Sequence, residues 1–85
     1  MPWELVIASP AAKDLRRLSR DDLRRIDHAF DSMRTNLYSG DVKFLSGMGG
    51  VLRRRVGVWR ILFEVNQQRR TVVVLGVKRR TSTTY

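Results

Sequence analysis

The sequence predicts an α+β fold, in which a two-helix hairpin packs on one face of a small, mainly antiparallel four-stranded sheet. Three observations predict it. A short apolar run opens the chain, residues 19–37 repeat apolar side chains at helical spacing, and the second half holds three runs of strand composition. The expected order is strand, helix, helix and three strands. We expect a single domain over residues 1–85, because a chain of this length has room for one modest core.

The first strand and the first helix are predicted from residues 3–18. Residues 3–8 (WELVIA) have the length and composition of a strand. Ser9 and Pro10 then predict a helix start, since Ser9 can accept a backbone N–H as N-cap and proline suits the first turn. The helix that follows carries apolar side chains on one side, at Ala11, Ala12, Leu15 and Leu18.

A second, longer helix follows at once. Ser19 and Asp22 have the spacing of a capping box, which predicts its start. Its apolar side chains recur at intervals of three and four residues, which is typical of one buried helix face: Leu23, Ile26, Phe30, Met33 and Leu37. Gly40 is expected to end it.

The second half predicts an antiparallel meander. Residues 41–50 read as a connector, and their glycines lack the spacing of a phosphate-binding loop. Short connections separate the three strands that follow, which we expect at residues 51–56, 58–65 and 70–78. The strand at residues 3–8 must join this sheet, but the sequence leaves its neighbour open.

Positive charge is concentrated in the second half of the chain. The formal net charge is +9, yet residues 1–42 hold seven basic and seven acidic side chains. Residues 43–85 hold ten basic side chains and one acid, Glu64. A field on one side of a protein favours polyanions such as RNA. An acidic protein partner, or a merely solvated surface, satisfies the same pattern.

The composition excludes several kinds of site. The absence of cysteine excludes disulfides and thiolate metal sites, and a single histidine excludes a multi-histidine metal centre. We therefore expect no metal and no cofactor. His28 lies between the polar and apolar sides of its helix, so we do not expect it to act as a catalytic base. No apolar run approaches membrane-spanning length and no leader is present, which predicts a cytoplasmic protein with no membrane contact.

Strand alternation predicts where the arginines of the second half lie. Trp59, Ile61, Phe63 and Val65 share one strand face, which the helices should cover, so Arg60 projects from the other. If the neighbouring strand packs in the same way, Arg53 and Arg55 lie beside Arg60. Arg79 and Arg80 should reach this cluster from the end of the last strand. Arg54 falls on the covered side, where we expect it to snorkel or to pair with an acid.

Four stretches carry a resemblance to a known family. They are SPAAKDLRRL, KFLSG, LRRRVGVWRILFEV and VVVLGVKRRTSTTY. Together they resemble the RelE/ParE superfamily of toxins from bacterial type II toxin–antitoxin systems, over nearly the whole chain. The lysine–arginine pair followed by Tyr85 is similar to the RelE branch, which cuts messenger RNA in the ribosomal A site.

The resemblance implies a set of site residues. Arg60 matches the family's phosphate-contacting arginine, Arg79 the one that stabilises the leaving oxygen, and Tyr85 the tyrosine that stacks on the nucleotide. Arg53 falls where the best-known RelE has a lysine assigned as general base. The expected catalytic residues are thus Arg53, Arg60, Arg79 and Tyr85, with Arg55, Lys78 and Arg80 binding RNA. This chain departs from the pattern at Val51, where the family has a second lysine, and arginine is a poor base.

The resemblance also implies a reaction and partners. The ribose 2′-OH would attack the adjacent phosphate without a metal ion, with messenger RNA held by the ribosome. A cognate acidic antitoxin would cover the basic face. Two alternatives remain open. One is a ParE-like inhibitor of DNA gyrase, and the other is a non-catalytic module that binds RNA or an acidic partner.

Overall fold

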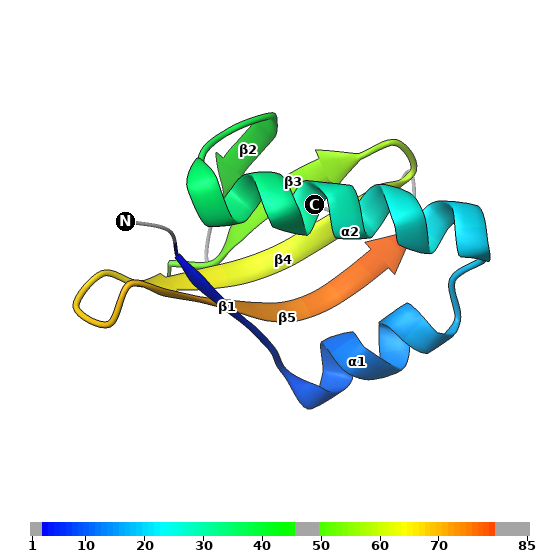
Figure 1. Ribbon diagram of the computed structural model, residues 1–85, viewed down its shortest axis with the longest axis horizontal. Coiled ribbons are helices and arrows are strands. Elements are labelled where there is room, and N and C mark those ends of the chain that lie inside the picture. Colours follow the sequence, from blue (N-terminus) through cyan, green and yellow to red (C-terminus); the bar gives the residue numbers. More distant parts are fainter. Residues whose placement is uncertain (1–2, 46–49, 80–85) are drawn as a thin grey trace.

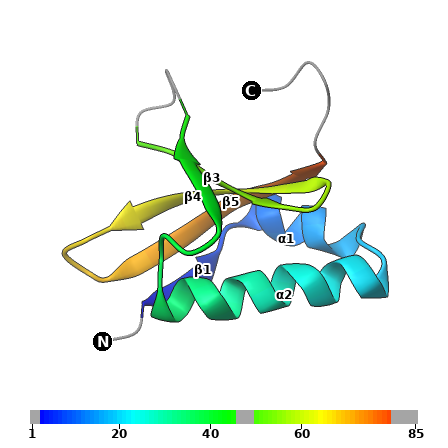
Figure 2. The ribbon, with the colours of Figure 1, turned by 90° about the horizontal axis from the view of Figure 1, so that it is seen from above.

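A five-stranded sheet with two helices forms the fold. The computed structural model describes residues 3–45 and 50–79. The elements in chain order are β1 (Glu4–Ile7), α1 (Ser9–Arg16), α2 (Arg20–Thr35), β2 (Asp41–Phe44), β3 (Leu52–Val56), β4 (Trp59–Asn66) and β5 (Thr71–Arg79). The strands are arranged in the order β1-β5-β4-β3-β2 (Figure 1). Helix α2 covers one face of the sheet, and among the described residues no helix covers the opposite face, which we call the open face (Figure 2).

The predicted α+β class is confirmed, but the predicted number of four strands is wrong. The additional strand is β2, which the sequence assigned to a connector. It pairs antiparallel with β3, from Asp41 opposite Arg55 to Phe44 opposite Leu52. Because β2 has only four residues (DVKF), its alternation of polar and apolar side chains is too short to identify a strand, and its conformation depends on pairing with β3. The neighbour of β1, which the sequence left open, is β5, and the two strands run parallel.

The core lies between α2 and the covered face of the sheet. The apolar face predicted for the second helix is largely confirmed, since Ile26, Phe30 and Met33 are buried, and Leu37 is buried just after the helix. Leu23 is only half-buried. Ala11 of α1 and Ala29 of α2 also belong to this core. The sheet contributes the buried side chains of Leu52, Ile61, Phe63, Val72, Val74 and Val77.

The helix termini follow the sequence only in part. The Oγ of Ser19 accepts the N–H of Asp22 at 3.1 Å, as predicted for the N-cap of α2. The predicted N-cap of α1 is wrong: Ala8 holds that position without a side-chain hydrogen bond, and Ser9 is already helical. Helix α2 ends at Thr35, before Gly40, which takes a φ of 80° in the turn leading to β2.

Arg54 lies under α2, on the covered side, as strand alternation predicts. Its described partners are neutral oxygens and not an acid. Nη1 donates to the carbonyl of Ala29 at 3.1 Å, to Ser32 Oγ at 3.3 Å and to Ser39 Oγ at 3.4 Å. Burial lowers the pKa of Arg54. Arg54 therefore ties β3 to α2 and to the turn that follows α2, which places the start of β2.

Gly40 is required here for two reasons, and the substitution Gly40→Ala tests both. A side chain at φ 80° is strained, and a Cβ at Gly40 would lie 3.0 Å from Arg54 Nε. Gly57, at φ 58°, has no atom within 4 Å of an added Cβ. Each alanine variant should lose about 1–2 kcal/mol from backbone strain, and Gly40→Ala should lose more. Urea unfolding checks this, and equal losses at the two glycines would contradict it.

Candidate functional site

Three basic side chains lie in register across the open face. Arg55 of β3 is opposite Arg60 of β4, and Arg60 is opposite Lys78 of β5. Residues directly opposite one another in a sheet point to the same face. The neighbouring positions Val56 and Trp59 pack against the helix-side core, so this row points away from the helices. We call Arg55, Arg60 and Lys78 the cation row.

A carboxylate from β2 stands at one end of this row. Asp41 is opposite Arg55, and its Oδ2 lies 3.7 Å from Arg55 Nε. Its Oδ1 lies 3.3 Å from Nη1 of Arg53, which occupies the next open-face position of β3. Arg53 and Arg60 are each only 5% exposed. The site therefore holds two deeply placed guanidinium groups and one half-exposed acid, and it combines positive potential with a group that can accept a proton.

The expected placement of Arg53, Arg55 and Arg60 on one face agrees with the structure, while their chemical roles stay predictions. The expected placement of Arg79 in the same cluster is wrong. Arg79 is opposite Trp59 and so takes the covered side, because it directly follows Lys78 in the strand. There it lines a depression of about 230 Å³ with Asp14, Arg17 and Trp59. Two further predicted site residues, Arg80 and Tyr85, lie outside the described residues.

Sequence reasoning missed two acidic residues next to the cation row. Asp41 was assigned to a connector, so its position beside two arginines became visible only with strand β2. Asp14 of α1 accepts the N–H of Val77 at 2.9 Å, and its Oδ2 lies 3.1 Å from Lys78 Nζ. No local pattern could reveal this second contact, because the partners are more than sixty residues apart in the chain.

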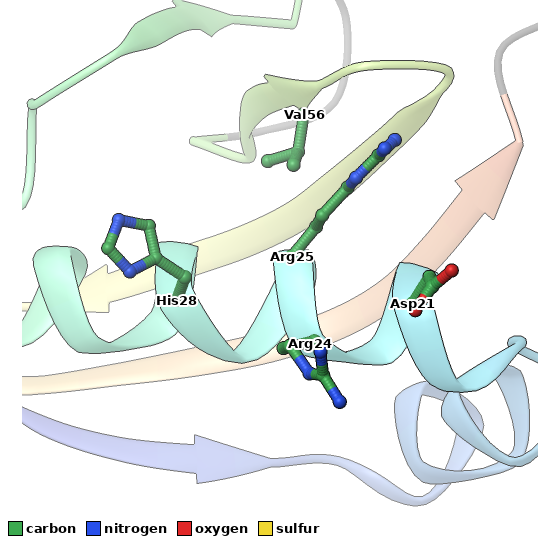
Figure 3. A pocket seen from close by; sticks show the side chains of 5 residues that line it. All are labelled: Asp21, Arg24, Arg25, His28 and Val56. Carbon is green, nitrogen blue, oxygen red and sulfur yellow. The ribbon is translucent and has the colours of Figure 1, made fainter.

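A second hollow lies on the helix side. It is an open depression of about 590 Å³ between α2 and the end of β3, lined by Asp21, Arg24, Arg25, His28 and Val56 (Figure 3). His28 is exposed there. Because α2 covers the face opposite the cation row, His28 is not placed to serve the row as a base.

In residues 3–45 and 50–79, no three His, Cys, Asp or Glu side chains are grouped so that they could hold a metal ion. Neither described helix is long and apolar enough to span a membrane.

Comparisons with known proteins point to one family. The profile of a family described as the ParE toxin of the type II toxin–antitoxin system parDE matches residues 5–83. No protein with a curated function matches the sequence.

Solved structures resemble the whole fold. A chain of the RelBE2 toxin–antitoxin complex of Mycobacterium tuberculosis is 26% identical with a TM-score of 0.83, covering 94% of this chain and 100% of that one. A chain of the RelE–RelB complex of Pyrococcus horikoshii is 25% identical with a TM-score of 0.83, covering 98% and 100%. The isolated RelE toxin of E. coli, at 17% identity and a TM-score of 0.80 over 95% and 87%, shares the fold.

The cation row should bind an anion in the absence of any metal. We expect tripolyphosphate to raise the melting temperature, because a ligand that binds only the folded state stabilises it by mass action. Arg55→Met should weaken the apparent affinity by about fivefold, the contribution of one partly exposed charge contact. Arg69→Met is the matched control, since Arg69 is exposed in the turn between β4 and β5. Equal effects of the two substitutions would mean that only net charge matters.

Proposed function

The chain belongs to the ParE toxin family of type II toxin–antitoxin systems, within the RelE/ParE superfamily, and we propose that it is a ribosome-dependent endoribonuclease that cuts messenger RNA. The observation that carries this proposal is the cation row with Asp41 at its end. Guanidinium groups match the geometry of phosphate oxygens, and three adjacent strands hold the basic side chains at fixed positions. The similarity to RelE-type chains at 25–26% identity supports the same branch.

The reaction we propose is attack of the ribose 2′-oxygen on the adjacent phosphorus. The bond from phosphorus to the 5′-oxygen breaks and this oxygen takes a proton from water, which leaves a 2′,3′-cyclic phosphate and a free 5′-hydroxyl. Arg60, at the centre of the row, and Arg55 beside it stabilise the additional negative charge of the pentavalent phosphate. Arg53 reinforces this potential and orients Asp41.

Asp41 fills a role that the arginines cannot. Arginine stays protonated near neutral pH, so Arg53 is unsuited to the task of the family's general-base lysine. The Asp41 carboxylate is half-exposed and within ion-pair distance of both neighbouring arginines. We propose that it accepts the proton of the 2′-OH. A carboxylate is a weak base, and the ribosome contributes by holding the substrate in line for attack.

The remaining predicted site residues belong to the path of the RNA. Lys78 and Arg80 are proposed to contact flanking phosphates, and Tyr85 to stack on a base, as in readers of single-stranded RNA. Arg79 projects from the covered side at the end of β5. It lies away from the phosphate at the centre of the cation row, so we propose that it contacts a flanking phosphate of an RNA strand that turns around this end of the sheet, and not the leaving oxygen.

Partners follow from the same proposal. The similar RelE-type chains were solved as complexes with RelB antitoxins. We propose that an acidic antitoxin covers the open face of this chain, where its carboxylates would replace phosphates as partners of the arginines. Action on translating ribosomes places the protein in the cytoplasm.

Inhibition of DNA gyrase is the second candidate, and one observation favours it: the matching profile is that of the ParE toxins and covers residues 5–83. In that case, the cation row would bind a protein surface and no RNA chemistry would occur.

Expression in a bacterial host separates these two functions. We expect primer extension to reveal cuts within the codons of a translated message, which disappear when translation is blocked. Arg60→Met should abolish the cuts and the growth arrest, because it removes the central cation. Arg69→Met, with the same loss of charge, should retain both. Growth arrest with intact messages and induced DNA damage would instead favour gyrase inhibition.

Asp41→Asn should separate catalysis from binding. We expect the cleavage rate on ribosomes to fall by about 10²-fold or more, the usual contribution of a general base, while RNA affinity does not fall. Asp31→Asn is the control, because Asp31 forms an exposed ion pair with Arg34 on α2. Single-turnover cleavage and binding of a 2′-O-methyl RNA give the two readouts. An unchanged cleavage rate would remove Asp41 from the mechanism.

A further inference from the structure

Asp14 connects α1 to the end of β5 that carries Lys78. Its carboxylate accepts the backbone N–H of Val77 at 2.9 Å and lies 3.1 Å from Lys78 Nζ. The Asp14 side chain is 14% exposed, whereas that of Lys78 is 51% exposed. The acid is therefore held in place by α1 and the β5 backbone, and the lysine is the mobile partner.

This contact diverts Lys78 from the direction its strand position gives it. Lys78 is opposite Arg60 and so starts out on the open face. Its ammonium group nevertheless ends at Asp14, which lies where β5 continues beyond its pairing with β1. Lysine is a flexible point charge, so it can take either position. The local charge balance decides which one it takes.

Gly76 makes room for this arrangement. A Cβ at Gly76 would lie 3.3 Å from Lys78 Cε and 3.3 Å from Asp14 Oδ2. The missing side chain lets the Lys78 stem pass over the strand to reach the acid. Gly76 lies in the middle of β5 without a positive φ, so backbone conformation does not require glycine here. Close packing of the lysine and the acid does.

We propose that Asp14 is a specificity-determining residue, which competes with RNA phosphates for Lys78 and thereby weakens the binding of RNA that is not presented in the productive position. The inference rests on the proposed RNA binding at the open face. A phosphate that binds Lys78 must first displace the Asp14 carboxylate from it. A phosphate that binds Arg55 and Arg60 does not have to displace Asp14. Binding to arbitrary RNA is thus reduced more than binding at the centre of the row.

Four variants and one control variant test the competition with a short 2′-O-methyl RNA, which cannot react through a 2′-OH. Asp14→Asn keeps an acceptor for the Val77 N–H and removes the charge that holds Lys78. We expect its affinity to rise by about threefold to fivefold, as expected for release of one partly exposed ion pair. The log–log salt dependence should steepen by about 0.7, the value for one additional phosphate contact on a single strand. Asp31→Asn, which makes the same charge change on the outer face of α2, should show neither effect.

The double variant Asp14→Asn with Lys78→Met isolates the lysine. The rise in RNA affinity caused by Asp14→Asn should be absent in this double variant. Replacing Lys78 by Met should lower RNA affinity less in the wild type than in the Asp14→Asn variant. Gly76→Ala gives an independent route, because its Cβ crowds Lys78 away from Asp14, and it should also raise affinity. Urea unfolding confirms that each variant is folded.

Two results would overturn the inference. One is an Asp14→Asn affinity equal to or below that of Asp31→Asn, and the other is a gain that persists when Lys78 is replaced. If the wild type binds no RNA, the proposed function fails, and tripolyphosphate then replaces RNA in the same set of variants. A tripolyphosphate affinity that rises in Asp14→Asn only while Lys78 is present supports the competition independently of any RNA.

Discussion

The register between β3, β4 and β5 is the constraint on which the site depends. Arg55, Arg60 and Lys78 come from three successive strands, and the pairing of these strands brings them into one line. Shifting any of these strands by one residue would move its basic side chain under the helices. Burial of Ile61 and Phe63 on the other face prevents such a shift. The same packing that stabilises the fold therefore fixes the positions of the charges.

The three consecutive arginines of β3, Arg53 to Arg55, have two different roles because side chains in a strand alternate between the two faces of the sheet. Arg53 and Arg55 face the open side and share Asp41, while Arg54 lies beneath α2 among neutral oxygens. Desolvation lowers the pKa of Arg54. The run of arginines thus stabilises the attachment of α2 with its middle member and builds the charged face with the other two.

The sequence was sufficient to predict the orientation of side chains wherever one helix or strand had a clear apolar pattern of its own. The apolar spacing of α2 and the alternation in β4 predicted which side chains face the core and hence where Arg60 lies. It was insufficient where position depends on a partner strand or on distant contacts. The four residues of β2 are too few for their alternation to reveal a strand, so Asp41 was missed. The contact of Asp14 with the end of β5 joins residues more than sixty positions apart. Arg79 was misplaced because the predicted strand ended at residue 78, so strand alternation was not extended to Arg79, which the structure includes in β5.

The parallel pairing of β1 with β5 affects the order in which the newly synthesised chain can fold. Glu4–Ile7 finds its partner only in residues 71–74, which the ribosome adds after nearly everything else described. Until residues 71–74 have been synthesised, β1 has no partner strand, and pairing between segments this far apart in sequence forms slowly. The cation row is likewise complete only once Lys78 has been synthesised. A newly made chain therefore acquires its charged face only after residues 71–78 have been added, later than every other residue of the cation row.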